Sequence, residues 1–191
     1  MSNKNKIFQF FSKNFPFNKE GLDDLITSFE EEIYEKGDII LRPESIETKL
    51  KFIQSGFIRE YYMTETREAN INFYEESEFA TDFNSFFENK KTKKWQQCLT
   101  NAIILTISKN RFNELLIKYS CGSSIIQTTF QKILRQKDVI EYSKLTKSTE
   151  DLYKDIQLKK PNWIKSIPQY HIASYLNVTP ETLSRIRKRI Y

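Results

Sequence analysis

Glycine, proline, cysteine and histidine are scarce in this chain of 191 residues, which holds four Gly, five Pro, two Cys and one His. It also has no low-complexity tract and no internal repeat. The two cysteines, Cys98 and Cys121, are too far apart for a zinc ribbon and too few for an iron–sulfur cluster, so we expect reduced thiols. One histidine, His171, is little material for a metal site or for proton transfer, and we expect no metal and no cofactor.

Long apolar runs and enzyme signatures are missing as well. No stretch approaches the roughly 18 consecutive apolar residues that span a bilayer, and the polar start MSNKNK lacks the apolar run of a signal peptide. We therefore expect a cytoplasmic protein without a membrane partner. The chain has no HExxH, no glycine-rich phosphate loop and no catalytic-triad spacing, so the sequence predicts that it is not an enzyme.

Apolar and aromatic residues, by contrast, are abundant. Hydrophobic residues make up 39% of the chain and aromatic residues 14%, which is enough to form a globular core. The net charge of +5 is compatible with a nucleic-acid partner without requiring one, and its distribution is more informative. Between positions 165 and 191, where Glu181 is the one acid, the basic residues are Lys165, Arg185, Arg187, Lys188 and Arg189.

The apolar pattern changes along the chain. Residues 6–31 carry apolar side chains at steps of three and four, which predicts one or two short helices, interrupted at Phe15-Pro16-Phe17 because Pro disfavours helix at the residue before it. Short strands at close intervals, with Gly37 and Gly56 at tight turns, then favour a sandwich, jelly roll or barrel. The β-branched and aromatic runs that predict these strands lie at 39–41, 50–53, 57–62, 71–73 and 102–107.

From residue 109 the helical period returns and continues to Leu145. A helix of this length with one apolar stripe is typical of a dimer seam or of a strut between domains. The alternative is two ordinary core helices separated by a break near Cys121 and Gly122. A charged stretch at 144–160, followed by two prolines, marks the expected boundary to a small C-terminal unit.

The terminal segment IPQYHIASYLNVTPETLSRIRKRI carries the strongest functional signal. Two short helices that cross steeply need a small residue where they touch, which Ala173 supplies, and a tight turn, for which Asn177 tolerates left-handed φ. Thr179 and Pro180 are typical of the N-cap and the first position of a second helix. The apolar residues of the shared inner face are Ile172, Leu176, Val178, Leu183 and Ile186. The pattern predicts a helix-turn-helix.

A recognition helix presents its N-terminal side chains to base edges in the major groove of double-stranded DNA. Arg185 can donate two hydrogen bonds to guanine, and Glu181 can accept one from cytosine. The expected base-reading residues are Pro180, Glu181, Ser184 and Arg185. The residues expected to contact phosphates, which gives affinity and salt dependence, are Thr179, Arg187, Lys188 and Arg189. The alternative is an ordinary helical hairpin whose basic residues form a solvated face.

The run Glu181-Thr182-Leu183-Ser184-Arg185 resembles the E-T-[VIL]-[SG]-R motif in the recognition helix of the Crp/Fnr family of transcription regulators. Three further stretches resemble successive strands of that family's cyclic-nucleotide-binding jelly roll: EKGDIIL (35–41), FIQSGFIREYY (52–62) and AIILTISKNRFNELL (102–116). The likeness covers nearly the whole chain, although only the C-terminal motif is specific. It implies a homodimer on a palindromic DNA site, with RNA polymerase as a further partner.

The sensory site of that family is where this sequence departs from it. The family's cyclic-nucleotide binders carry F-x-G-E-L and, further along, an Arg that grips the cyclic phosphate. Aligned without a gap, Thr81 replaces the Gly of this motif, Asp82 replaces the Glu, and Gln97 stands at the Arg position. A neutral amide cannot replace a charge-assisted bidentate pair, so we expect no response to cyclic AMP, and the effector is left open.

The expected fold class is α+β, with an N-terminal jelly roll of the cyclic-nucleotide-binding type at 1–118, a long linking and dimerisation helix at 119–146, and a C-terminal helix-turn-helix of the winged-helix type at 147–191. The expected function is sequence-specific DNA binding by a dimeric transcription regulator. The alternative is a jelly-roll module that binds a small molecule and does not read DNA. The aromatic side chains that could line its cavity, although such residues are more often core, are Phe79, Phe83, Phe86, Phe87 and Trp95.

Overall fold

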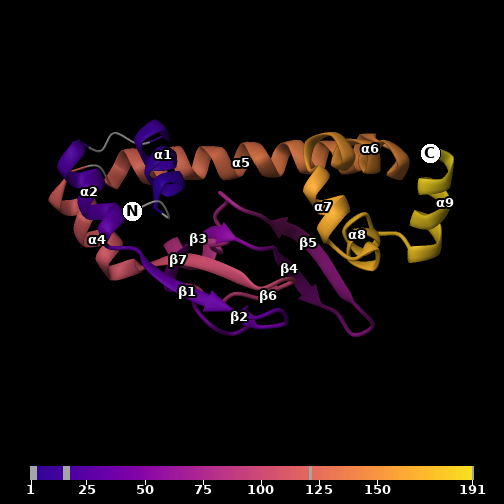
Figure 1. Cartoon of the computed structure of the whole chain (residues 1–191), viewed down its shortest axis with the longest axis horizontal. Helices are drawn as coiled ribbons and strands as arrows, with labels where there is room; N and C mark the ends of the chain where they lie inside the picture. The colour runs from indigo at the N-terminus through magenta and orange to yellow at the C-terminus, as the bar shows by residue number, and fades with distance from the viewer. Residues whose placement is uncertain (1–3, 15–17, 121, 191) are drawn as a thin grey trace.

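The computed structural model describes residues 4–14, 18–120 and 122–190 (Figure 1). The strands in these ranges are β1 (Glu30–Tyr34), β2 (Ile39–Leu41), β3 (Lys49–Ser55), β4 (Ile58–Met63), β5 (Glu68–Tyr74), β6 (Trp95–Cys98) and β7 (Ala102–Ser108). The helices are α1 (Asn5–Asn14), α2 (Lys19–Thr27), α3 (Phe83–Glu88), α4 (Lys109–Lys118), α5 (Gly122–Thr146), α6 (Thr149–Lys159), α7 (Pro161–Ser166), α8 (Gln169–Tyr175) and α9 (Pro180–Ile190). Within α5, side chains are described at 127, 131, 132, 135 and 138–146. No helix in the described ranges is long and apolar enough to cross a membrane.

The strands form two antiparallel sheets, with the orders β1-β7-β3 and β2-β6-β4-β5 (Figure 1). Ile53 and Ile104 of the first sheet share one buried cluster with Ile58 of the second, so the two sheets pack against each other as a β roll. The strands predicted between 39 and 107 are all present, and two packed antiparallel sheets agree with the sandwich, jelly roll or barrel that these strands favoured. β1 and β6 were not predicted.

The two glycines that the sequence placed at turns both have left-handed backbone, with φ of +99° at Gly37 and at Gly56. At Gly56, between β3 and β4, a Cβ atom would also lie 2.6 Å from the carbonyl oxygen of Asn101. Glycine is therefore required there twice, for its conformation and for the close approach of the two loops.

Helices α1, α2 and α4 close one end of the roll around an aromatic core, which confirms the helices expected within 6–31. Phe11, Phe29 and Phe112 are each 2% exposed in this core. The interruption expected at Phe15-Pro16-Phe17 lies outside the described residues.

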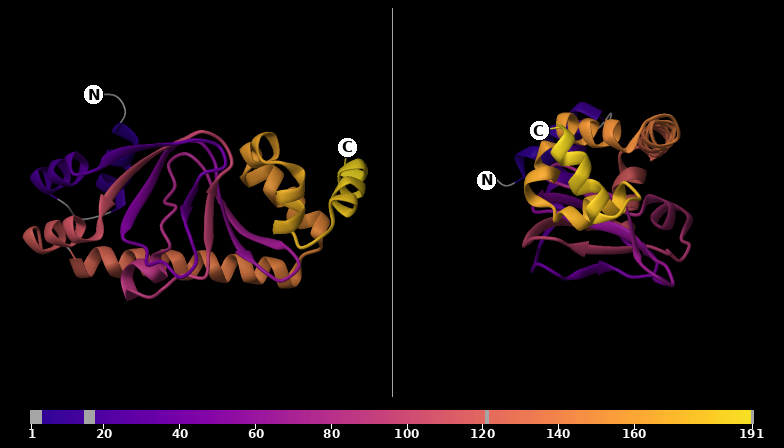
Figure 2. Two further views of the ribbon diagram at one scale, coloured as in Figure 1. Left: turned by 90° about the horizontal axis from the view of Figure 1, so that it is seen from below. Right: turned by 90° about the vertical axis from the view of Figure 1, so that its right-hand side faces the viewer.

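The helical period that starts at residue 109 belongs to two helices. α4 ends at Lys118 and α5 begins at Gly122, so the helix is interrupted where the alternative interpretation placed the break. Cys121 itself lies outside the described residues. α5 is nevertheless 25 residues long, and it runs along the roll from the end that carries α4 to the C-terminal helices (Figure 2). Within one chain it is a strut between the two ends of the molecule.

The C-terminal helices α6–α9 share a second core, in which Tyr153, Trp163, Ile172 and Leu183 are buried. Phe73 of β5 belongs to the same cluster, so this helical unit is packed directly onto the second sheet of the roll. A winged-helix type would add a β-hairpin, but the described residues from 122 to 190 contain helices and no strand.

Candidate functional site

Charged and polar side chains that contact one another occupy the space between the two sheets. Lys51 of β3 spans this space: its Nζ lies 2.6 Å from Glu47 Oε2 and donates to Gln96 Oε1 of β6 at 2.7 Å. Gln96 donates in turn to Glu60 of β4 at 3.0 Å. All four residues are at most 3% exposed. Buried charges are tolerated only when they are paired, and these form one connected network.

Lys94 extends the network to Asp82. Its Nζ lies 3.5 Å from Glu60 Oε1 and 3.0 Å from Asp82 Oδ1, while Thr92 Oγ1 donates to Asp82 Oδ2 at 2.6 Å. Burial acts to raise the pKa of Asp82, but the Thr92 hydrogen bond and the Lys94 charge together hold it below its usual value. Asp82 is therefore ionised and fully engaged within the protein at neutral pH.

The three residues expected in the degenerate effector pocket do not lie together. Thr81 and Asp82 border the network, and Thr81 Oγ1 accepts the backbone N–H of Lys51 at 2.8 Å. Gln97 instead accepts a hydrogen bond from Arg59 at 2.8 Å and donates to the carbonyl of Gly37 at 2.9 Å. The side chains that contact the Asp82 carboxylate belong to Thr92 and Lys94, so an alignment by sequence alone does not identify the partners of this residue.

α8 and α9 are joined by a tight turn. Asn177 has φ of +56°, and the N–H of Val178 donates to the carbonyl of Ala173 at 3.0 Å. Ala173 is fully buried where the helices meet. Thr179 caps α9, since its Oγ1 accepts the N–H of Thr182 at 3.2 Å. The left-handed turn and the N-cap that the sequence predicted at these positions are confirmed.

The residues expected to read bases all lie on the open side of α9. Pro180, Glu181, Ser184 and Arg185 are exposed, whereas Leu183 and Ile186 of the same helix are buried in the second core. Hydrogen bonds from its own backbone amide and from Thr179 lower the pKa of Glu181, which keeps this side chain ionised as a hydrogen-bond acceptor.

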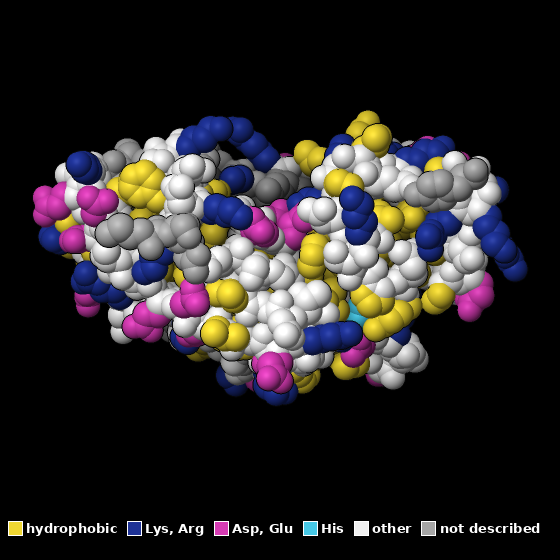
Figure 3. Space-filling model, viewed as in Figure 1, with side chains coloured by type: hydrophobic (Ala, Val, Ile, Leu, Met, Phe, Trp, Pro, Cys, Tyr) yellow, Lys and Arg dark blue, Asp and Glu magenta, His cyan; other side chains and the backbone are white. Residues whose placement is uncertain are grey.

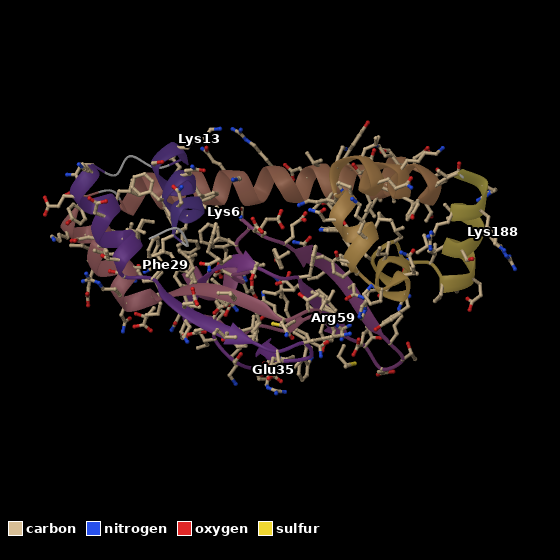
Figure 4. All side chains as sticks on the ribbon, in the orientation of Figure 1. Lys6, Lys13, Phe29, Glu35, Arg59 and Lys188 are labelled. Atoms are coloured by element: carbon tan, nitrogen blue, oxygen red, sulfur yellow. The ribbon has the colours of Figure 1, made fainter. Side chains whose placement is uncertain are left out.

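The residues expected to contact phosphates differ in their surroundings. Thr179 and Lys188 are exposed, and Lys188 points away from the rest of the molecule (Figure 4). Arg189 Nη2 lies 3.5 Å from Glu150 Oε2 of α6. Arg187 is half-buried, and its Nε is buried without a hydrogen-bond partner among the described residues. Basic side chains are also visible over the α9 end of the surface (Figure 3).

Polar contacts that the sequence did not predict hold α8 against the roll. Arg59, which is 5% exposed, lies between the second sheet and α8, with its Nη1 3.3 Å from His171 Nδ1 (Figure 4). Ser174 Oγ accepts the N–H of Asn70 at 3.1 Å. Burial, followed by the charge of Arg59, lowers the pKa of His171 to about 4, so this histidine is neutral at neutral pH.

The turn itself is also tied to the roll. Arg67, in the hairpin between β4 and β5, donates from Nη2 to Asn177 Oδ1 at 2.8 Å. Lys160 forms ion pairs with Glu75 at 3.2 Å and with Glu78 at 2.5 Å at the other edge of the same interface. The position of α9 relative to the roll is therefore set by contacts of α7 and α8 with the β4–β5 hairpin and the segment after it.

Solved structures with this architecture are found among bacterial regulators. No family model and no curated protein matches the chain by sequence. The structure matches CLP, the c-di-GMP responsive global regulator of Xanthomonas campestris, with a TM-score of 0.67 and 16% identity over 91% of each chain. The chain therefore has a Crp/Fnr-like fold.

Two further matches agree with this fold. A mutant of CooA from Carboxydothermus hydrogenoformans gives a TM-score of 0.64 at 17% identity, over 86% of this chain and 77% of that one. The catabolite activator protein of Thermus thermophilus gives 0.57 at 15% identity, over 91% and 84%. At such identities the likeness is one of fold, including the roll of the cyclic-nucleotide-binding type.

Proposed function

We propose that the chain is a sequence-specific DNA-binding transcription regulator of the Crp/Fnr type, in which α8 and α9 form the helix-turn-helix. The observation that carries this proposal is the two-sided character of α9. Leu183 and Ile186 anchor it in a core, while Glu181, Ser184 and Arg185 project to solvent from its N-terminal half. That is the half of a recognition helix that meets base edges.

The exposed basic residues of α9 divide into two groups in this proposal, and the half-buried Arg187 stays outside both. Arg185, next to the N-terminal turn, reads a base, because a guanidinium matches the two acceptors of guanine. Lys188 and Arg189, near the C-terminal end, contact phosphates. Binding of Arg189 to a phosphate would exchange its surface ion pair with Glu150, and exposed pairs of this kind are worth only about 0–1 kcal/mol. The exchange therefore costs little.

Dimerisation belongs to the same proposal. One recognition helix covers only a short half-site, and a two-fold dimer through α5 would place two of them one helical turn of DNA apart, at about 34–36 Å. The apolar stripe expected at this seam includes Ile126, Phe130 and Ile133, whose side chains lie outside the described ones. CLP and the catabolite activator protein are a regulator and an activator by name, which supports the same role for this chain.

The charged network between the sheets supports a roll that does not respond to cyclic AMP. A cyclic nucleotide needs a free carboxylate for its ribose and a cation for its phosphate. Here Asp82 is engaged by Thr92 and Lys94, and Lys51 is engaged by Glu47 and Gln96. Binding would have to break these buried pairs without a replacement for each.

DNA binding can be tested by its salt dependence. We expect anisotropy of a labelled duplex of mixed sequence to report an affinity that falls steeply between about 50 and 200 mM salt. Lys188→Gln should reduce the slope of log affinity against log salt by about 1 for each subunit, and therefore by about 2 for the dimer. Lys90→Gln, the same charge change at a side chain of the roll that is 71% exposed, should leave the slope unchanged. Failure of the native chain to bind at low salt, or equal effects of the two variants, would contradict the proposal.

A further inference from the structure

A cavity of about 1030 Å³ lies between α5, the roll and the C-terminal helices. Its walls combine residues of α1 and α3 at one end, β5 and α5 along its length, and α6, α7 and α8 at the other end. The stretch of α5 that borders it, from Gln131 to Lys144, is on the order of 20 Å long. This volume is at the upper end of the range for small-molecule sites, and the cavity is separate from the charged network inside the roll.

One half of the cavity is aromatic. Phe10 of α1 lies 5.0 Å from Phe79 between ring centroids, Phe79 lies 6.4 Å from Phe83, and Phe83 stacks on Phe87 at 5.9 Å. Three of the aromatic residues singled out from the sequence therefore do line a cavity. Phe86 is instead fully buried against the core, and Trp95 stacks on Tyr61 in the roll. The row of rings offers a long apolar surface to a ligand.

The charges around the cavity are unequal. Among the described residues that line it, Glu78 and Asp155 are the acids. Asp155 is already paired with Lys159 of α6, and Glu78 with Lys160, the next residue. Three further cations line the cavity, and in the described part of the chain no carboxylate lies within ion-pair distance of any of them: Lys132, Arg135 and Lys144.

Lys132 and Lys144 each lie over an aromatic ring, at different ends of the cavity. Lys132 Nζ lies 5.0 Å from the ring centroid of Phe10 in α1, and Lys144 Nζ lies 4.8 Å from that of Tyr175 in α8. Partial burial lowers the pKa of Lys144, and no neighbouring acid opposes this effect. Lys144 is nevertheless exposed as a residue, so an anionic group in the cavity can reach its ammonium without displacing a carboxylate.

We propose that this cavity binds a lipophilic monocarboxylate of the fatty-acid class, with its hydrocarbon chain against the phenylalanine rings and its carboxylate at Lys144. The surplus of cations over acids in the lining favours an anionic occupant, and the row of rings favours one with a long apolar tail.

The location of Lys144 gives such binding a consequence for α9. A carboxylate at Lys144 would replace the contact with Tyr175, and Tyr175 packs on Phe73 and Trp163 where the helical unit meets the roll. Occupancy would therefore change the contacts that set the position of α8 and α9. This regulatory step rests on the proposed DNA-binding function, whereas the binding of the ligand does not.

The test uses the full chain and no DNA, so that its outcome is independent of DNA binding. With Trp95→Phe, the one remaining tryptophan is Trp163, which lines the cavity. We expect dodecanoate to change its fluorescence saturably and to bind about tenfold more tightly than the neutral dodecanol, as a charge-assisted hydrogen bond implies. Lys144→Gln should abolish this preference for the carboxylate. Lys154→Gln, the same charge change on α6 outside the cavity, should retain it.

Three results would overturn the proposal. One is equal affinity for dodecanoate and dodecanol in the native chain. The second is an unchanged preference in Lys144→Gln, with Lys144→Met measured as well so that a folding defect of one variant does not decide the outcome. The third is dodecanoate binding only at dilutions at which sedimentation shows monomers, which would identify a second copy as the native occupant.

Discussion

Removal of the Lys51 ammonium should be among the most destabilising single changes in the roll. Lys51 is 3% exposed and contacts both Glu47 and Gln96, so Lys51→Met leaves a buried carboxylate without its cation and an amide oxygen without its donor. Breaking a buried pair from one side costs about 3–5 kcal/mol. We expect a loss of this size in the free energy of unfolding.

Lys49 provides a matched control on the same strand. It pairs with Glu32 at 2.5 Å, but its side chain is 47% exposed, so Lys49→Met should cost only about 0–1 kcal/mol. The double variant Lys51→Met/Glu47→Gln should recover about 2 kcal/mol relative to Lys51→Met, since it no longer buries an unpaired charge.

Urea unfolding followed by tryptophan fluorescence and far-ultraviolet circular dichroism measures all four chains at pH 7. The two signals must coincide for the free energies to be comparable. If Lys51→Met lowers the free energy of unfolding no more than Lys49→Met does, the network between the sheets does not hold the roll together and the reasoning is refuted.

Four further predictions concern the C-terminal unit and the thiol. Asn177→Ala should lower the free energy of unfolding by about 1 kcal/mol relative to Asn177→Gly, because the Cβ of alanine disfavours the φ of +56° and glycine has no Cβ. Chemical denaturation measures the difference, and equal stability of the two variants would contradict the prediction. Between pH 6.5, the usual pKa of histidine, and about pH 4, the pKa of His171 in the folded chain, the unfolded chain binds a proton at His171 that the folded chain does not. The free energy of unfolding should therefore fall as pH falls through this window, and His171→Gln should remove that part of the loss. Burial raises the pKa of Cys98 to about 11, so in a Cys121→Ser chain this thiol should react with a disulfide reagent at pH 8 only after unfolding. Arg185→Ala should cost about 1–3 kcal/mol of DNA affinity and relax discrimination at one base pair, and an unchanged ranking of DNA sites would exclude Arg185 from base reading.

The strands and turns that the sequence predicted are those in which local preference and tertiary context agree. Leu50 to Ile53 and Ala102 to Ile107 are rich in β-branched and aromatic residues, and both segments are buried between layers. Asn177 was predictable because few other residues accept left-handed φ. In these places the local rule alone leads to the correct conformation.

The elements that were missed depend on contacts distant in sequence. β1 is the acidic segment EEEIY, and it is extended because each of its residues pairs with β7. β6 is WQQC, whose two glutamines bond Lys51 and Arg59. Lys51 stands between two apolar residues, a pattern typical of a strand with one face in solvent. Its contacts with Glu47 and Gln96 show that this face is internal.

Dependence on contacts distant in sequence also decides which parts of the candidate site could be predicted. The open face of α9 follows from its own sequence, whereas the partners of Asp82 and the docking of His171 on Arg59 depend on how loops and layers meet. The alignment of Gln97 with a family Arg shows the difference, since its hydrogen bonds are to Arg59 and Gly37 and not to Asp82. The division of the chain into three domains stays a prediction.

The central claim is that two copies of α9 read DNA, and selection of bound sequences from a random pool tests it most directly. We predict enrichment of a palindrome whose half-site centres lie about one helical turn apart, and loss of preference at one position of each half-site with Arg185→Ala. A pool that shows no enrichment above the protein-free control, or a winner that the native chain and Arg185→Ala bind alike, would contradict the account.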